Sequence, residues 1–396
     1  MSSTDWPITT LGKVTQLKSG NTPSKSRPEL WGNHLPWVTA RDLKTRHLSS
    51  ASECLSEAGA ELGKIAPPGS ILVLVRGMTL HKDIPVCLST SALAFNQDIK
   101  AFIVTESLHP EFLQYVILSQ RNNILQHVES AGHGTGKLGT EFLRSIPVPV
   151  PDLGEQLQIV EVIQTWDEAI EKTNRLSVLI DKRKRVLQRT LVSFNEQRRV
   201  PLGSLVTAIT RPVPKPNDPY RAMSIRSHGK GTFERIVRDP AKVTMDTLFQ
   251  VKPGDLVVNI TFAWEGAIAL VEDGREGCLV SHRFPTYRID QRRVDSQYLH
   301  HVVRSGRFVH WLGMVSPGGA GRNRVLNKKD FLKLPVPLPS LEEQRRIASV
   351  LECAEREIGT LETYLSNLEN QKRGLMQKLL SGEWRLPVTR RSPCDA

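Results

Sequence analysis

The sequence lacks the features of a membrane-bound or secreted protein. No apolar run reaches the roughly 18 residues that a membrane-spanning helix requires. The first residues, 1–7, have neither the charged nor the apolar region of a signal peptide. Cysteine is scarce and forms no Cys-x-x-Cys pair, which argues against a disulfide framework and a zinc site, and favours a reducing compartment. The cysteines are Cys54, Cys87, Cys278, Cys353 and Cys394. We therefore expect a soluble, cytoplasmic protein without membrane contact.

Recognisable catalytic motifs are also absent. No Ser/His/Asp set, pair of carboxylates or metal-ligand cluster can be argued from spacing, so we expect neither catalytic residues nor a bound metal. The segment 132–137, Gly-His-Gly-Thr-Gly-Lys, is not a nucleotide phosphate loop, because Ala131 replaces the first glycine and Leu138 replaces the magnesium-binding hydroxyl. The segment 217–220, Asn-Asp-Pro-Tyr, lacks one proline of a similar methyltransferase motif, and no glycine-rich turn precedes it.

Positive charge is in excess. The chain has 53 Lys+Arg against 41 Asp+Glu, which gives a formal net charge of +12 and a pI near 9.6. This excess favours a polyanionic partner, usually nucleic acid, although a protein that is merely basic has the same composition. The length of 396 residues allows two to three domains, and 39% apolar residues are typical of an ordinary folded protein.

One segment occurs twice, 188 residues apart. Residues 146–158 read Ile-Pro-Val-Pro-Val-Pro-Asp-Leu-Gly-Glu-Gln-Leu-Gln, and residues 334–346 read Leu-Pro-Val-Pro-Leu-Pro-Ser-Leu-Glu-Glu-Gln-Arg-Arg. Apolar residues then recur at every third and fourth position after each copy, which predicts a long helix with a narrow apolar seam. The predicted seam residues are Ile159, Ile163, Trp166, Ile170, Ile180, Leu187 and Leu191 in the first copy, and Ile347, Leu351, Ile358, Leu361, Leu365, Leu368, Leu375 and Leu379 in the second.

The two predicted helices should pair with each other. Each is expected to begin just beyond Pro151 or Pro339, because the prolines disfavour helix before them. The stretch 159–191 would form a rod about 50 Å long. A narrow seam needs a partner, so we expect an antiparallel coiled coil, against the alternative of core helices in one large domain. Lys184 and Lys372 interrupt both seams at the same place. We favour side chains that reach out of the seam to water, over a position near a pseudo-two-fold axis or against a partner or phosphate.

Removing the helices leaves two globular segments of similar length. We predict an α+β fold with globular domains at 1–150 and 198–338, helical spacers at 151–197 and 339–384, and a C-terminal tail at 385–396. The order globule, helix, globule, helix indicates an internal duplication, in which one chain imitates a symmetric dimer.

The two globules share landmarks. In each, a Pro-Gly turn precedes an apolar run that is typical of a buried strand, and a short amphipathic helix follows later. The expected strands are 70–75 and 256–260, and the expected helices are 110–117 and 296–303. The second helix contains His300 and His301, which have no ligand-spaced companion and are expected on the helix surface rather than at a metal.

Basic and amide side chains concentrate on Gly/Pro-rich loops of both globules. Arg and Lys can read guanine, and Asn and Gln can read adenine, while many such side chains only hold phosphate. Each alone is more often a solvated charge, but their concentration favours DNA. The candidate DNA-binding residues are Lys18, Thr22, Ser24, Lys25, Arg41, Arg76, Asn96, Gln97, His133, Thr135 and Lys137 in the first globule, and Arg211, Lys215, Arg221, Arg226, His228, Lys230, Asn259, Trp264, Ser281, His282, Arg283, Arg322, Asn323 and Arg324 in the second.

Over nearly its whole length the chain resembles the specificity subunit of type I restriction-modification systems. The most specific similarity lies in the twin Pro-Val-Pro-x-Pro…Glu-Gln segments and the helices that follow them. One departure is Gly154, where many copies carry an acidic residue, as Glu342 does in the second segment. Further similarity lies in Gly20–Ser24 with Leu35–Val38, and in Arg226–Gly231, Phe262–Ala267 and Ser281–Phe284.

The resemblance implies a non-catalytic reader of double-stranded DNA. Its two target recognition domains would bind the halves of an asymmetric, bipartite site, and its helices would form the spacer and dock two modification subunits, through which restriction subunits join. S-adenosylmethionine, ATP and Mg are expected on those partner subunits, and no cofactor in this chain. Two alternatives remain open: a methyltransferase or nuclease that acts alone, and a coiled-coil scaffold without a DNA role.

Overall fold

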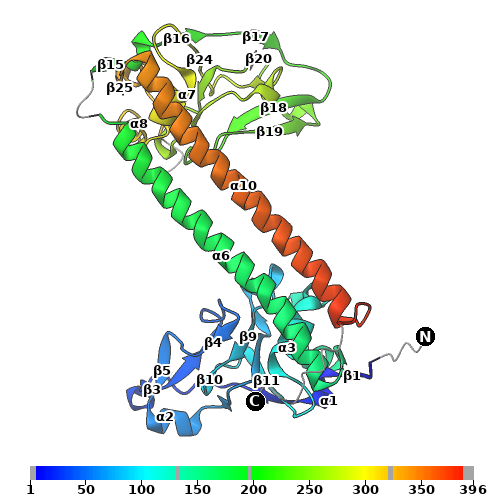
Figure 1. Ribbon diagram of the computed structural model, residues 1–396. Coiled ribbons are helices and arrows are strands. Elements are labelled where there is room, and N and C mark those ends of the chain that lie inside the picture. Colours follow the sequence, from blue (N-terminus) through cyan, green and yellow to red (C-terminus); the bar gives the residue numbers. More distant parts are fainter. Residues whose placement is uncertain (1–5, 131–133, 195–197, 320–323, 387–396) are drawn as a thin grey trace. The chain divides into compact units, whose positions relative to one another are not determined.

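The computed structural model describes residues 6–130, 134–194, 198–319 and 324–386 (Figure 1). The chain divides into two compact units, Met1–Asn174 with Tyr364–Ala396, and Arg175–Thr363. The division falls within the two long helices α6 (Leu153–Leu191) and α10 (Leu341–Leu380), so each unit contains one mixed α/β globule and a part of each helix. No helix among the described residues is long and apolar enough to cross a membrane.

The first unit is built on two main sheets. Its strands are β1 (Ile8–Thr10), β2 (Thr15–Ser19), β3 (Trp31–Val38), β4 (His47–Leu48), β5 (Glu53–Leu55), β6 (Ile65–Ala66), β7 (Ile71–Leu74), β8 (Arg76–Gly77), β9 (Val86–Ser89), β10 (Leu93–Phe95), β11 (Ile99–Val104), β12 (Glu129–Ser130), β13 (Gly136–Lys137) and β14 (Pro147–Pro149). Its short helices are α1 (Leu11–Val14), α2 (Glu57–Leu62), α3 (Pro110–Ser119), α4 (Arg121–Gln126) and α5 (Thr140–Ser145). The sheets have the orders β2-β11-β7-β9-β4 and β5-β3-β10-β6, beside smaller sheets β1-β14 and β12-β13-β8.

The second unit has a similar plan. Its strands are β15 (Arg199–Pro201), β16 (Val206–Ile209), β17 (Pro212–Pro214), β18 (Tyr220–Ile225), β19 (Thr232–Val237), β20 (Thr247–Gln250), β21 (Leu256–Val258), β22 (Ile268–Leu270), β23 (Leu279–Val280), β24 (Thr286–Ile289) and β25 (Pro335–Pro337). Its short helices are α7 (Ser296–Val303), α8 (Gly306–Met314) and α9 (Lys328–Lys333). The sheets have the orders β16-β24-β21-β22, β17-β20-β23-β18-β19 and β15-β25.

The landmarks shared by the two globules are confirmed. The predicted strands correspond to β7 and β21, all of whose residues are buried, and the predicted short helices correspond to α3 and α7. Both Pro-Val-Pro segments form short strands, β14 and β25, whose central Val148 and Val336 are fully buried. Among the described strands, β14 pairs only with β1 and β25 only with β15, an edge arrangement that tolerates the missing N–H of proline.

The two long helices begin where the prolines predict. Asp152 accepts a hydrogen bond from the N–H of Glu155 at 2.8 Å, and Ser340 accepts one from Glu343 at 3.2 Å, so each helix has a side-chain cap at its start. The predicted seam residues are all buried or half-buried. In each unit one end of α6 and the opposite end of α10 join the same hydrophobic core, so the two helices run antiparallel there.

A buried glutamine ties α6 to the globule of the first unit. Gln156 is fully buried, and its Oε1 accepts a hydrogen bond at 2.7 Å from the backbone N–H of His109, the residue before α3. Its Nε2 donates to the carbonyls of Ser107, at 3.0 Å, and Pro151, at 2.9 Å. One amide therefore satisfies three backbone groups and fixes the start of α6 against the start of α3.

The second unit repeats this glutamine clamp, in which one buried amide bonds to three backbone groups. Gln344 is also fully buried, and its Oε1 accepts a hydrogen bond at 2.8 Å from the N–H of Asp295, the residue before α7. Its Nε2 donates to the carbonyls of Arg293, at 3.4 Å, and Pro339, at 2.9 Å. These contacts explain why the repeated segment contains glutamine at the same place in both copies.

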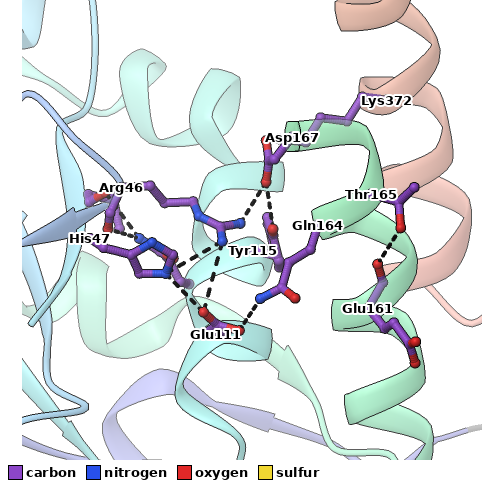
Figure 2. A network of polar contacts seen from close by, with 11 residues as sticks. Arg46, His47, Glu111, Tyr115, Glu161, Gln164, Thr165, Asp167 and Lys372 are labelled. Atoms are coloured by element: carbon purple, nitrogen blue, oxygen red, sulfur yellow. Dashed lines mark hydrogen bonds and ion pairs between the residues drawn. The ribbon is translucent and has the colours of Figure 1, made fainter. Parts of the chain in front are cut away.

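An acidic residue on α6 joins both long helices to the globule in the first unit. Asp167 accepts hydrogen bonds from Arg46 and from the hydroxyl of Tyr115, both at 2.6 Å, and pairs with Lys372 of α10 at 2.5 Å. The guanidinium of Arg46 also lies 4.7 Å from the centre of the Tyr115 ring. Figure 2 shows these groups converging on the carboxylate, beside a hydrogen bond from Gln164 to Glu111.

The second unit has an equivalent ionic joint, a carboxylate that links both long helices to the globule. Here the acid comes from α10 and the lysine from α6. Glu355 of α10 pairs with Lys184 of α6 at 2.7 Å and with Arg304 of the globule at 3.0 Å. The offset of 188 residues relates Glu355 to Asp167 and Lys184 to Lys372. The expectation that both lysines reach out of the seam to water is therefore wrong, since each is half-buried in an ion pair with the other helix.

The prediction for the histidine pair is also wrong. His301 is buried, with 1% of its surface exposed, and His300 is half-buried with its Nε2 at 2.8 Å from Arg304 Nη1. Burial, reinforced for His300 by the charge of Arg304, lowers the pKa of His300 to about 3, and burial lowers that of His301 to about 4. Burial opposes ionisation of Glu355, yet the hydrogen bond from Lys184 and the charge of Arg304 keep its pKa below the ordinary value.

Replacing the clamp glutamine of the first unit tests its contribution to stability. Gln156→Leu leaves three buried backbone groups without their partner, and we expect the free energy of unfolding of that unit to fall by about 3 kcal/mol. The exposed Gln371→Leu on α10 is the matched control and should change it by less than about 0.5 kcal/mol. Urea denaturation monitored by hydrogen exchange of each unit measures both. Equal effects of the two substitutions would contradict a clamp.

The buried histidines predict a pH dependence confined to the second unit. Their pKa values are lowered in the folded state, so the unfolded chain binds more protons between pH 6.5 and about 4, and stability is lost as the pH falls through that range. The first unit has Gln114 and Tyr115 at the equivalent positions and should not show this loss. His301→Gln should reduce the slope of the urea midpoint against pH between 6.5 and 4.5, and an unchanged slope would contradict the assignment.

Candidate nucleic-acid interface

Two tryptophans position an exposed loop of the first unit. Trp31 and Trp37 lie edge to face with ring centres 4.9 Å apart, and their Nε1 groups donate to the carbonyls of Ser24 and Asn21, each at 3.1 Å. The ammonium of Lys25 lies 4.9 Å and 5.3 Å from the two ring centres. The rings therefore fix the backbone of residues 21–25 and leave the side chains of Thr22, Ser24 and Lys25 at the surface.

The exposed side chains of this loop can exchange their partners for a ligand. Thr22 donates to Oε1 of Gln97 at 2.6 Å, which brings two predicted residues from distant segments together. Lys25 pairs with Glu53 at 2.8 Å, but both side chains are solvent-exposed, and such a pair contributes little. A DNA phosphate or base edge can compete for these groups. Ser24 is exposed as well and contacts Ser26 at 2.8 Å.

A second group of the first unit consists of Arg76 and Lys137. They stand directly opposite each other on the antiparallel strands β8 and β13, and both are exposed. Like charges opposite each other on neighbouring strands repel, so this pair favours an anion bound over it. Thr135 precedes them and is half-buried, and Arg41 is exposed on another loop. His133 lies outside the described residues.

The second unit brings together the three segments that resemble recognition-domain signatures. The N–H groups of His228 and Gly229 donate to the carbonyls of Glu265, at 2.7 Å, and Gly266, at 3.2 Å. The segment 281–284 is joined through the N–H of Ile260, which donates to the carbonyl of Arg283 at 3.0 Å. Segments far apart in the sequence thus form one surface.

A tight turn presents the basic side chains of this surface. His228 has a φ of 62° and is followed by Gly229 and Gly231, also with positive φ, so the backbone turns sharply and exposes Arg226, His228 and Lys230. The guanidinium of Arg226 lies 5.1 Å from the ring centre of Phe233. His282 and Arg283 are exposed nearby in sequence to the half-buried Ser281.

Arg324 and Trp264 form a cation–π pair at the same surface. The guanidinium of Arg324 lies 5.1 Å from the indole centre, and its nitrogens donate to the carbonyls of Ser316, at 3.1 Å, and Gly313, at 2.5 Å. The indole Nε1 donates to the carbonyl of Thr261 at 3.2 Å. The neighbouring predicted residues Arg322 and Asn323 lie outside the described residues.

Several predicted residues have internal partners instead. Arg211 makes two hydrogen bonds, at 2.5 Å and 3.1 Å, to Asp255, which is only 4% exposed. Arg221 is held by Glu234, with two contacts at 2.8 Å, and this hydrogen bond lowers the pKa of Glu234 and raises that of Arg221. Lys215 donates to the carbonyl of Val243 at 2.8 Å. These three cations stabilise the second unit, because each neutralises or caps a group of its own fold.

Three further predicted residues, Asn96, Asn259 and Lys18, make hydrogen bonds within their own unit. Asn96 and Asn259 are each 8% exposed, and their amides bond locally, to Asp98 at 3.1 Å and to the N–H of Thr261 at 3.1 Å. Lys18 is half-buried and reaches the carbonyl of Ile65 at 3.5 Å. Their positions fit a role in shaping the loops that carry the exposed candidates.

Sequence reasoning missed the aromatic supports of the candidate loops in both units. Trp31, Trp37 and Phe233 hold the loops and cations described above but were not among the candidates. The segment Leu35–Val38 contains Trp37 and was the available signal. No group of three or more His, Cys, Asp and Glu side chains among the described residues is arranged to hold a metal.

The chain matches known proteins along most of its length. The family model for the type I restriction modification DNA specificity domain matches residues 3–180 and 259–370, which together exceed half of the chain. The specificity subunit of the Escherichia coli restriction enzyme EcoR124I/EcoR124II is 30% identical over 161 residues, which are 40% of each chain. The MjaVIII specificity subunit of Methanocaldococcus jannaschii is 20% identical over 96% of this chain and 93% of that protein. The chain thus covers less than half of the first relative but nearly all of the second.

Solved structures share the fold. A chain from a study of complex assembly and conformational transition of the type I restriction-modification system has a TM-score of 0.62 at 17% identity, over 97% of this chain and 100% of its own. The S subunit of a type I system from M. genitalium has a TM-score of 0.53 at 15% identity, over 96% and 97% of the two chains. On the basis of the family match and the duplicated fold, the chain belongs to the type I restriction modification DNA specificity family.

Proposed function

We propose that this chain is the non-catalytic DNA-recognition subunit of a type I restriction-modification complex. Each unit binds one half of an asymmetric, bipartite site in double-stranded DNA. The two long helices connect the units and dock two modification subunits, through which restriction subunits join. S-adenosylmethionine, ATP and Mg bind to those partner subunits rather than to this chain.

The observation that carries the proposal is the combination of equivalent frameworks with unlike exposed loops. The clamps at Gln156 and Gln344 occupy equivalent places, whereas the loops differ, with a tryptophan-supported segment in the first unit and a glycine turn at 228–231 in the second. Duplicated scaffolds with different reading surfaces suit a site whose halves differ in sequence.

Methylome sequencing of the host with and without this gene tests the proposal directly. We expect loss of one two-part methylated motif when the gene is removed. A methylome that does not change, in a host with active modification subunits, would contradict the assignment. Methyl transfer by the purified chain alone would instead support a methyltransferase.

The internal partners predict which arginines read DNA and which stabilise the fold. Arg283→Ala removes an exposed cation and should weaken DNA binding about tenfold and reduce its salt dependence, with little change in stability. Arg211→Ala leaves Asp255 buried without its cation and should lower the free energy of unfolding by about 3 kcal/mol. Salt titrations of DNA affinity and urea denaturation separate the two effects. The exposed Lys172→Ala on α6 is the control, and an equal loss of affinity in this variant would refute the distinction.

A further inference from the structure

A basic cleft lies in the second unit, where the end of α6 meets the start of α8. Its volume is about 530 Å³, and its rim carries Arg185, Arg189 and Arg307. Phe194 is buried in its floor, and the guanidinium of Arg307 lies 5.6 Å from the centre of that ring. Arg185 pairs with Asp181 at 2.7 Å on the exposed helix surface. The cleft therefore combines an apolar floor with a cationic rim.

The first unit has two adjoining clefts at the corresponding place, where the end of α10 meets the start of α4. They share Ser119 and Gln377 and have volumes of about 650 Å³ and 360 Å³. Arg121 and Arg373 line one of them, and the buried Leu380 lines the other. The acids Glu369 and Glu383 also contribute to the lining, so this region is less basic than the cleft of the second unit.

The two sites are related by the internal duplication. The offset of 188 converts Arg185 to Arg373 and Ser193 to Ser381, all of which line these clefts. From the short helices, Ser119-Gln-Arg121 corresponds to Ser305-Gly-Arg307 through the alignment of α3 with α7. The chain has therefore kept clefts at equivalent positions in both units, in which Gln377 replaces Arg189 and Gly382 takes the place of Phe194.

This similarity argues for a ligand that is the same in both halves. The DNA half-sites differ, whereas two copies of one partner protein present identical surfaces to the chain. The concave shape points the same way, because clefts of several hundred Å³ accommodate side chains, while the phosphates of a duplex meet exposed cations on a convex backbone. Arginine rims over apolar floors suit carboxylates flanked by apolar side chains.

We infer that the cleft region of each unit receives an acidic segment of one modification subunit. The inference rests on the proposed function and assigns its partner a position in each unit. Because the cleft of the second unit is more basic, charge reversal there should weaken binding of the modification subunit more than charge reversal in the first unit.

Titration of the full-length chain with the modification subunit of the same system tests the inference. Arg185→Glu with Arg189→Glu should weaken one of two binding events at least about tenfold, and native mass spectrometry should then show one bound subunit in place of two. Arg373→Glu should weaken the other event by a smaller factor. Duplex DNA binding by the free chain should be unchanged in all variants and reports that they remain folded.

The matched control is Lys182→Glu, an exposed charge reversal on the same helix outside the cleft. Unchanged affinity in both cleft variants, with two subunits bound by the unmodified chain, would overturn the inference alone. Weaker DNA binding with normal subunit binding would assign the clefts to phosphate and overturn it as well. If the unmodified chain binds no modification subunit, the proposed partnership fails together with the clefts.

Discussion

The buried amides of Gln156 and Gln344 determine how each long helix meets its globule. Each amide bonds to three backbone groups, at the end of the proline segment and at the start of a short helix. Backbone groups buried at such a junction are costly to leave without partners, so the side chain that satisfies them is difficult to replace. This constraint explains why the repeated segment is the best-kept part of the duplication, while the loops on the sheets have diverged.

The ionic joints add a second level of connection between the helices and the globules. Asp167 and Glu355 each bind one cation from the opposite helix and one from the globule. A partly buried carboxylate held in this way contributes geometry more than stability, because removal from water opposes the attraction of the charges. A seam that was apolar throughout would permit sliding, whereas an acid and a lysine at fixed positions specify one register.

The sequence was sufficient for the features that depend on local rules. Proline placed the starts of α6 and α10, heptad spacing predicted the seams, and Pro-Gly turns located the buried strands β7 and β21. It was insufficient where a side chain's partner is distant in the chain. Lys372 finds Asp167, which lies 205 residues away, and Arg211 finds Asp255, which lies 44 residues away. Composition cannot distinguish these cations from Arg76 or Arg283, because only the fold decides which of them has a buried or half-buried carboxylate beside it.

The division of each long helix between two cores affects how the protein is made. The second unit is continuous from Arg175 to Thr363, whereas the core of the first unit includes Met376, Leu379 and Leu380 from the end of α10. As domains fold during synthesis, the ribosome releases all residues of the second unit before the last helix turns of the first. The part of the protein that is translated first therefore completes its core last. Until the end of α10 is released, the apolar surface that Met376, Leu379 and Leu380 cover stays exposed and prone to aggregation.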